Sequence, residues 1–342
     1  MRIIGGTYGG RVLTEFENIG VRPTSDMVRE SLFNILRDKI DGARFLDLFC
    51  GTGAVGIEAV SRGASHVTFN DNSSKSLECL NKNLTSLKIT DGFSVSLRDG
   101  LAFLQSTTEK FDIIYLDPPY SAELGETALN YALNCLAPNG VIIYETDKIK
   151  EFRLEGLFNF DTRKYGRNVL YFFERKKPPC VFAGTFDPIT KGHENLIKRC
   201  LSEYEKVVVT LGENYGKTPF FDRKERLEFL KLVFGDDKDV IIADYLELKD
   251  TYAEFLNRIG VKYFVRGIRN DLDAVYETAS VSKNKELYPS VETVFVKADK
   301  KYKKISSSTV REYVKQGKNI TPFIPDKCKD QVINAINNKK LN

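Results

Sequence analysis

The sequence predicts an α/β protein of two domains, each with a parallel sheet flanked by helices. Its 342 residues are about twice the length of a common domain. One stretch beginning near residue 45 and another beginning at residue 180 each combine an apolar strand, a glycine-containing turn and a helical pattern, the order typical of parallel sheets. The stiff polar segment Lys176-Lys177-Pro178-Pro179 precedes the second stretch. We therefore expect a first domain over residues 1–177 and a second over residues 178–342.

Composition excludes several classes of protein. The chain is 42% hydrophobic and 29% charged, and no apolar run approaches the roughly 18 residues that span a bilayer. The N-terminus, "MRIIGGTYGGRVL", lacks the apolar core of a secretory signal. We therefore expect a cytoplasmic protein that has no membrane partner.

Cysteine usage and charge narrow the range of ligands. Six cysteines are scattered without a CxxC pair, and two histidines offer no zinc-ligand spacing, so we expect free, mostly buried thiols and no bound metal. Residues 1–177 contain 22 basic and 23 acidic side chains, against 29 and 24 in residues 178–342. Bulk charge therefore does not identify the first half as a nucleic-acid binder, although a local basic patch is compatible with it.

The first half contains a glycine-rich turn between two apolar runs. In "ARFLDLFCGTGAVGIEAVSRGASHVTFND", the run Phe45–Phe49 precedes the turn, a helical pattern follows, and a second run covers Val67–Phe69. Residues 51–56 satisfy GxGxxG, whose glycines allow a tight turn beneath a helix N-terminus that suits a nucleotide-like ligand. NAD, FAD and S-adenosylmethionine proteins share this pattern, and a turn without a ligand is the simpler alternative.

A second motif, "KFDIIYLDPPY", is more specific. The four apolar residues Ile113–Leu116 place Asp117 at the C-terminal end of a buried strand, where open α/β sheets bind ligands. The prolines that follow stiffen the loop and leave its carbonyls free to accept hydrogen bonds, and Tyr120 can stack on a base. The carboxylate and a carbonyl could therefore hold an exocyclic amine, whereas a proline-stiffened turn alone explains neither the acid nor the tyrosine.

Residues 1–177 resemble the bacterial methyltransferases that use S-adenosylmethionine to methylate the 2-amino group of a guanine in small-subunit (16S) ribosomal RNA. The resemblance rests on "MRIIGGTYGGRVL", "RPTSDMVRESLFNIL", "LDLFCGTGAVGIEA" and "DPPY", in this order. It implies a Rossmann-like methyltransferase fold. It also implies S-adenosylmethionine as cofactor and ribosomal RNA or a small-subunit particle as partner.

The same likeness assigns residues to the cofactor and to the base. Cofactor contacts are implied for Asp47, Gly51, Gly53 and, at the adenine amine, Asp99; the target base is held by Asp117, Pro118, Pro119 and Tyr120. The family usually has an acid for the ribose hydroxyls at the position of Asn70, whereas here the acid is Asp71. Because a one-residue shift turns a strand side chain to the other face, we expect Asp71 to serve only if it reaches round from the turn.

The family likeness also implies that the N-terminal glycines and arginines lie near the RNA. Among these are Arg22 and Arg29, which would approach RNA phosphates. Either arginine could instead pair with Asp26 or Glu30 on one helix, and the sequence leaves both interpretations open.

The second half gathers groups that bind anions. In "AGTFDPITKGH", Thr185 ends a strand and His193 enters a helix, so a hydroxyl, an imidazole and free helix N–H groups lie within nine residues. Lys217 lies in a loop before a helix that we expect to start at Phe221-Asp222, and "YFVRGIRN" ends a strand with two arginines around a glycine. "ISSSTVREYV" places hydroxyls at a helix start, where one would suffice as a cap.

Residues 180–335 resemble bacterial phosphopantetheine adenylyltransferase through "GTFDPITKGH", "KTPFF", "VRGIRNDLDAVYE" and "ISSSTVRE". The resemblance implies a Rossmann-like nucleotidyltransferase that transfers AMP from ATP to 4′-phosphopantetheine, giving dephospho-coenzyme A and pyrophosphate, with Mg²⁺ on ATP and a hexameric assembly. It implies catalytic roles for His193, Lys217 and Arg266. Substrate contacts are implied for Thr185, Phe186, Arg269, Glu277, Ser306, Ser307 and Ser308.

The sequence thus predicts a fusion of two enzymes, with alternatives. The first half could methylate another amine, of a DNA adenine or a protein glutamine, because similar loops serve those substrates. It could also be a degenerate RNA-binding module whose Asn70 departure has removed the cofactor, leaving the adenylyltransferase as the active enzyme. A second half that bound nucleotide without turnover would be a sensor, which the presence of His193, Lys217 and Arg266 argues against.

Overall fold

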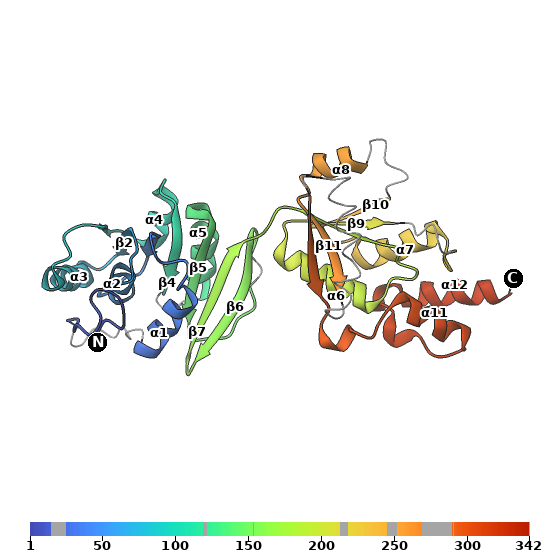
Figure 1. Ribbon diagram of the computed structural model, residues 1–342, viewed down its shortest axis with the longest axis horizontal. Coiled ribbons are helices and arrows are strands. Elements are labelled where there is room, and N and C mark those ends of the chain that lie inside the picture. The colour runs from blue at the N-terminus through green and yellow to red at the C-terminus, as the bar shows by residue number, and fades with distance from the viewer. Residues whose placement is uncertain are drawn as a thin grey trace. The chain divides into compact units, whose positions relative to one another are not determined.

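A computed structural model of the chain describes residues 1–14, 25–118, 122–152, 154–212, 218–244, 252–268, 289 and 291–341. The chain divides into two compact units, Met1–Arg175 and Lys176–Asn342, each built on its own sheet (Figure 1). Several predicted site residues lie outside the described ranges: Arg22, Pro119, Tyr120, Lys217, Arg269 and Glu277.

The N-terminal unit contains a seven-stranded sheet in the order β3-β2-β1-β4-β5-β7-β6. Strands β1 to β5 pair in parallel, and β7 pairs antiparallel with both β5 and β6. The strands are β1 (Arg44–Asp47), β2 (His66–Asp71), β3 (Phe93–Leu97), β4 (Phe111–Leu116), β5 (Leu136–Thr146), β6 (Leu157–Tyr165) and β7 (Asn168–Arg175). The helices are α1 (Asp26–Ile35), α2 (Ala54–Ser61), α3 (Ser74–Leu87), α4 (Gly100–Ser106) and α5 (Ala122–Cys135).

The apolar runs of this unit are buried on both faces of the sheet, as expected for parallel strands covered by helices. Neighbouring residues of one strand alternate between two cores: Phe45 packs with α1, α2 and α3, whereas Leu46 packs with α4 and α5. Chain order runs from β1 outward to β3 and then returns to β4. The carboxyl ends of β1 and β4 therefore flank a topological switch point, where such sheets bind ligands.

The C-terminal unit contains a five-stranded parallel sheet in the order β10-β9-β8-β11-β12. Its strands are β8 (Cys180–Gly184), β9 (Val207–Leu211), β10 (Val240–Asp244), β11 (Tyr263–Ile268) and β12 (Glu292–Lys297). Its helices are α6 (Lys191–Glu203), α7 (Arg223–Phe234), α8 (Tyr252–Ile259), α11 (Ser307–Lys315) and α12 (Lys329–Leu341), with short 3₁₀ turns η1 (Lys300–Tyr302), η2 (Thr321–Phe323) and η3 (Asp326–Cys328). The switch point of this sheet lies between β8 and β11.

Both units confirm the predicted α/β fold class, a Rossmann-like methyltransferase fold followed by a Rossmann-like nucleotidyltransferase fold. The six cysteines are free and buried, also as predicted. Within the described ranges, no helix is both long enough and apolar enough to cross a membrane.

Candidate active sites

The glycine turn of the N-terminal unit follows β1 and is held by the end of β2. Gly51 and Gly53 have φ values of 52° and 81°, in the left-handed region that favours glycine. A Cβ on Gly53 would lie 2.3 Å from the Leu80 side chain, whereas a Cβ on Gly51 would meet no atom within 4 Å. Gly53 is therefore required by packing, and Gly51 borders open space that a ligand can occupy.

Asp71 reaches this turn although it is one place later than the family's usual acid. Its Oδ2 accepts a hydrogen bond from the Gly51 amide at 2.8 Å, and its Oδ1 accepts one from the Ser73 amide at 2.8 Å. Asn70 is fully buried, and its Nδ2 donates to the carbonyls of Leu48 and Arg98, both at 3.1 Å. Asn70 thus ties the ends of β1 and β3 together, while the half-buried Asp71 carboxylate faces the glycine turn.

Asp47, predicted as a cofactor contact, ends β1 as a buried carboxyl. Its Oδ2 accepts the Gly56 amide of α2 at 2.9 Å. Burial raises the pKa of Asp47 to about 7, and the charge of Asp71 adds to the effect. Asp99 is exposed and caps α4, because its Oδ1 accepts the Ala102 amide at 3.0 Å. The other Asp99 oxygen accepts no hydrogen bond from the described residues, so it is available to a ligand.

Asp117 follows β4, and Pro118 beside it is buried. Leu116 pairs with Tyr144, so Asp117 lies beside Glu145 of the neighbouring strand. Burial raises the pKa of Asp117 well above its usual value, and the charges of Glu145 and Asp47 raise it further. The site therefore contains a carboxyl that holds its proton to higher pH than an ordinary aspartate.

Glu145 was not predicted from the sequence. Its side chain is buried and accepts hydrogen bonds from the hydroxyl of Tyr115 and from the side-chain Nδ2 of Asn168. The signal was present, because Glu145 follows the apolar run "VIIY" in the way that Asp117 follows "IIYL".

Arg29 does not contact RNA in the way that the family likeness implied. Its side chain is fully buried. Its Nη2 donates to the Arg2 carbonyl and to Asp26 Oδ1, both at 2.7 Å, and its Nη1 lies 3.6 Å from Glu58 Oε2. The predicted RNA contact of Arg29 is therefore wrong, and the alternative pair with Asp26 is confirmed.

The N-terminal segment is fixed on α2 by a second residue that the sequence did not reveal. Glu58 is fully buried and accepts the amides of Ile4 at 2.7 Å and Gly5 at 2.9 Å, besides Arg62 Nε at 2.7 Å. A Cβ on Gly6 would lie 1.8 Å from the Ser61 carbonyl, so only glycine fits there. The segment therefore has a defined position on the helix that follows the glycine turn.

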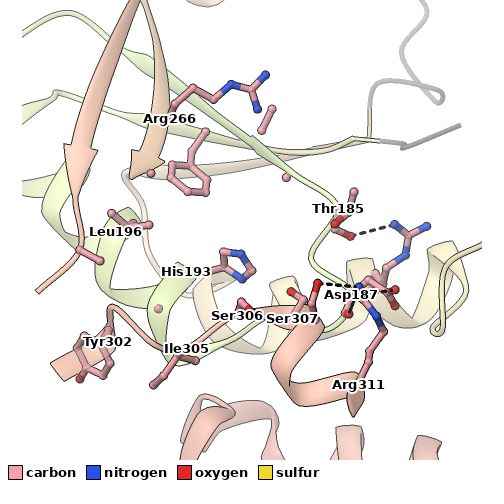
Figure 2. A pocket seen from close by; sticks show the side chains of 18 of the residues that line it. Thr185, Asp187, His193, Leu196, Arg266, Tyr302, Ile305, Ser306, Ser307 and Arg311 are labelled. Atoms are coloured by element: carbon pink, nitrogen blue, oxygen red, sulfur yellow. Dashed lines mark hydrogen bonds and ion pairs between the residues drawn. The ribbon is translucent and has the colours of Figure 1, made fainter. Parts of the chain in front are cut away.

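The C-terminal unit contains a pocket of about 900 Å³ at its own switch point. The lining includes Thr185, His193, Arg266 and the three serines 306–308, so the predicted residues that the structure describes meet in one place, apart from Phe186. Figure 2 shows the His193 ring between Arg266 on one side and Ser306 and Ser307 on the other. Arg266 comes from β11 and the serines from the start of α11.

His193 is held as a neutral hydrogen-bond donor. Thr190 caps α6, and its backbone N–H donates to His193 Nδ1 at 3.2 Å. Burial lowers the pKa of His193 to about 4. Because Nδ1 accepts, the neutral ring carries its proton on Nε2, which leaves a donor for a phosphate oxygen.

Phe186 was expected to contact substrate and instead supports the histidine. It is fully buried, and its ring lies edge-on to the His193 ring at a centroid distance of 5.1 Å. An apolar side chain at this depth offers no surface to a substrate. The side chain of Phe186 therefore cannot meet the substrate, which leaves only its backbone for the predicted contact.

The three serines make separate contacts. Ser306 Oγ accepts the Thr309 amide at 3.1 Å and so provides the expected helix cap. Ser307 Oγ donates to the Pro188 carbonyl at 2.8 Å, and Ser308 Oγ accepts from Arg311 at 3.1 Å. The three hydroxyls therefore face the pocket and also fix the start of α11, which Ser307 connects to the loop between β8 and α6.

Three charged residues of this pocket were not predicted: Asp187, Arg226 and Arg311. Asp187 is buried. Arg226 is also buried, and its Nη1 donates to the Thr185 carbonyl at 2.9 Å. Each arginine contacts the loop between β8 and α6, from a distance along the chain of 41 residues for Arg226 and 124 residues for Arg311, and local patterns do not reveal contacts at such separations.

Known proteins match the two halves separately. Residues 1–174 match the family described as "Conserved hypothetical protein 95", and residues 181–313 match the family described as "Cytidylyltransferase-like". A phosphopantetheine adenylyltransferase of Dictyoglomus turgidum is 40% identical over 146 residues, 43% of this chain and 89% of the relative. The protein of the same name from Wigglesworthia glossinidia brevipalpis is 33% identical over 151 residues, 44% of this chain and 88% of the relative.

Two solved structures are similar to the first half. A putative methyltransferase from Escherichia coli is 30% identical, with 51% of this chain and 97% of that chain covered and a TM-score of 0.46. A putative methylase from Haemophilus influenzae is 32% identical, with 52% and 98% covered and a TM-score of 0.44.

Proposed function

The chain belongs through residues 1–174 to the Conserved hypothetical protein 95 family and through its C-terminal half to the phosphopantetheine adenylyltransferase family, and we propose that it is one polypeptide with two transfer activities. Residues 1–177 methylate the 2-amino group of a guanine in 16S ribosomal RNA. Residues 178–342 transfer AMP from ATP to 4′-phosphopantetheine. The proposal also includes a cytoplasmic location and a hexamer that forms through the second domain. The molar mass measured by light scattering tests the hexamer.

The observation that carries the adenylyltransferase is the convergence of His193, Arg266 and the serines on one pocket. A phosphate oxygen of phosphopantetheine attacks the α-phosphorus of the Mg²⁺–ATP substrate, the bond from that phosphorus to the β-phosphate oxygen breaks, and pyrophosphate leaves. No enzyme nucleophile is needed. Catalysis then comes from alignment of the two substrates and from stabilisation of charge on the α-phosphate.

The pocket residues divide this task. His193 donates through Nε2 to an α-phosphate oxygen as a neutral ring, because its depressed pKa keeps the ring unprotonated at physiological pH. Arg266 and Lys217 neutralise the attacking phosphate, and Thr185 adds a hydroxyl. The serines 306–308, together with Arg269 and Glu277, hold ATP.

Pyrophosphate release measured in the wild type and in His193→Ala tests this assignment. We expect a loss of two or more orders of magnitude in kcat for the variant, as is usual when a donor to a developing charge is removed. Nucleotide binding without turnover by the wild type would instead indicate a sensor. Unchanged turnover by His193→Ala would contradict the assigned role.

For the first half, the observation that carries the proposal is the contact between Asp71 and the Gly51 amide. This contact puts a half-buried carboxylate beside open space at the switch point, where ribose hydroxyls of S-adenosylmethionine can be accepted. Asp47, Gly53 and Asp99 complete the cofactor side. The cofactor supplies the methyl group when bound.

Asp117 and Pro118 act on the target amine. The ionised Asp117 carboxylate and the Pro118 carbonyl accept the two protons of the guanine 2-amino group, which turns its lone pair toward the methyl donor. As the nitrogen–carbon bond forms and the donor's carbon–sulfur bond breaks, the nitrogen must lose a proton. Asp117 can take that proton, because its pKa is raised.

Calorimetric titration of S-adenosylmethionine into the wild type, Gly51→Val and Asp117→Ala tests the cofactor site. We expect binding in the wild type and in Asp117→Ala, and none in Gly51→Val, whose side chain would enter the open space. Absence of binding to the wild type would support the degenerate RNA-binding module. A methylation assay on small-subunit particles, duplex DNA and protein then separates the guanine from the other amines.

A further inference from the structure

Asp187 lies where three segments that line the nucleotide pocket meet. Its side chain is only 6% exposed. Its Oδ1 accepts the Phe221 amide at 2.8 Å, and its Oδ2 accepts the Phe220 amide at 2.9 Å. Thr218 and Pro219, immediately before these amides, line the pocket. One carboxylate therefore fixes the segment 218–221 against the loop that joins β8 to α6.

Arg311 connects the same carboxylate to α11. Its Nη1 donates to the Asp187 carbonyl and lies 3.2 Å from Asp187 Oδ2, while its Nη2 donates to Ser308 Oγ at 3.1 Å. Ser307 Oγ donates to the Pro188 carbonyl at 2.8 Å, next to the same site. Figure 2 shows Asp187, Ser307 and Arg311 side by side, apart from the His193 ring. We call the contacts of Asp187 with Phe220, Phe221 and Arg311 the Asp187 junction.

We propose that Asp187 and Arg311 are positioning residues of the adenylyl transfer, which hold the ATP-binding serines in register with the segment that follows Lys217. This inference rests on the proposed roles of those serines and of Lys217. The serines bind the donor, and Lys217 orients the attacking phosphate. The Asp187 junction then sets the distance between the two reacting groups through the segments that it connects.

The physics of the reaction makes such a junction consequential. Transfer between two bound substrates depends on the alignment of the attacking oxygen with the α-phosphorus, and a displacement of about 1 Å lowers the rate by about 100-fold. A buried carboxylate that accepts two amides and a guanidinium is a strong and directional joint, because charge-assisted hydrogen bonds gain strength away from water. Its loss should separate the two half-sites while each remains able to bind its own substrate.

Asp187→Asn tests this inference with little change in side-chain size. The amide keeps one acceptor oxygen, but its NH₂ group faces either the Phe221 amide or both the Phe220 amide and Arg311, and all three are donors. We expect kcat to fall by about 10- to 100-fold, with calorimetric Kd values for ATP and for phosphopantetheine changed less than about threefold. Arg311→Gln should behave alike. The double variant should lose no more than the worse single variant, because both residues act through one junction.

Asp222→Asn is the matched control. Asp222 adjoins the same segment, but its side chain accepts the Glu225 amide and caps α7 at an exposed position. We expect near-wild-type kcat from it. A kcat of Asp187→Asn within about twofold of wild type would overturn the inference. Losses that multiply in the double variant would also overturn it, since they would show independent roles.

Two further readouts separate positioning from stability and from the proposed site itself. Turnover is normalised to the number of ATP sites that calorimetry counts, so a smaller folded fraction does not count as a lower kcat. If the loss disappears on normalisation, Asp187 is only structural and the inference fails. His193→Ala is measured alongside. Wild-type turnover in His193→Ala would refute the proposed active site. Wild-type turnover in Asp187→Asn alone would refute the positioning role of the Asp187 junction.

Discussion

The raised pKa of Asp47 makes the stability of the N-terminal unit fall with pH in a calculable way. The carboxyl titrates at about 7 in the folded protein, against a usual value of 3.8. Between these values the folded state binds a proton that the unfolded state has lost, so the free energy of unfolding decreases as pH rises from about 4 to 7. The difference of about three pKa units corresponds to about 4 kcal/mol, since one unit is about 1.36 kcal/mol.

Asp47→Asn removes this dependence while its oxygen can still accept the Gly56 amide. We expect the stability of the variant relative to wild type to increase by up to about 4 kcal/mol between pH 4 and pH 8. Hydrogen exchange of the amides in β1 and β4, followed by mass spectrometry at several pH values, reports this unit without the other. Asp91→Asn controls for the same substitution at an exposed position. A difference between Asp47→Asn and wild type that is equal at pH 4 and pH 8 would refute the reasoning.

Three shorter predictions concern catalysis. Besides burial, the charge of Glu145 raises the pKa of Asp117, so Glu145→Gln should move the acidic limb of the methyl-transfer rate, where Asp117 titrates, to lower pH. A profile of kcat/KM against pH on ribosomal particles measures this shift, and a limb that does not move contradicts the prediction. Because His193 titrates at about 4, adenylyl transfer should show no histidine limb between pH 5.5 and 8, and a limb near 6.5 that disappears in His193→Asn would disprove the neutral donor. The pocket residue Tyr302 is flanked by four exposed lysines, Lys300, Lys301, Lys303 and Lys304. Replacing all four by glutamine should lower kcat/KM for ATP and weaken its dependence on salt concentration, with kcat unchanged, because the lysines attract the ATP anion. A salt dependence of stopped-flow ATP binding that does not change would contradict this electrostatic steering.

Local patterns in the sequence predicted the parts of the fold that depend on neighbouring residues. The apolar run before Asp117 is β4, and the run before Thr185 is β8. The expected helix start at Phe221-Asp222 is the N-cap of α7. Hydrophobic period and turn residues specify such elements, because the burial pattern of a strand and the cap of a helix are set by residues close along the chain.

The features that the sequence did not reveal depend on distant pairs. The sequence left Arg29 open to RNA or to Asp26 of its own helix, and arginine is almost never fully buried, yet its side chain is buried and its Nη1 lies 3.6 Å from Glu58 of α2. Asp187 meets its amide partners 33 and 34 residues away and Arg311 at 124 residues. These contacts depend on tertiary packing, which local periodicity does not specify.

The two units place opposite charges at the same position of similar sheets. At the carboxyl ends of four neighbouring strands, β2, β1, β4 and β5, the N-terminal unit has Asp71, Asp47, Asp117 and Glu145. Among the described residues, the C-terminal pocket is instead lined by Arg226, Arg266 and Arg311, with one acid, Asp187, besides hydroxyls and a neutral histidine. Clefts lined by one sign of charge concentrate ligands of the other sign.

This difference bears on two proposed ligands that share an adenosine. S-adenosylmethionine carries a sulfonium cation, whereas ATP carries a polyphosphate, so selection must come from what is attached to the adenosine. The carboxyls of this site that are ionised should disfavour ATP, because like charges in a partly desolvated cleft are poorly screened. We therefore expect millimolar ATP to leave the calorimetric affinity for S-adenosylmethionine unchanged within about twofold. The same result is expected when the titration is repeated with the His193→Ala variant. Competition that persists in a variant with a blocked Gly51 turn would place both ligands in the C-terminal pocket and contradict the separation.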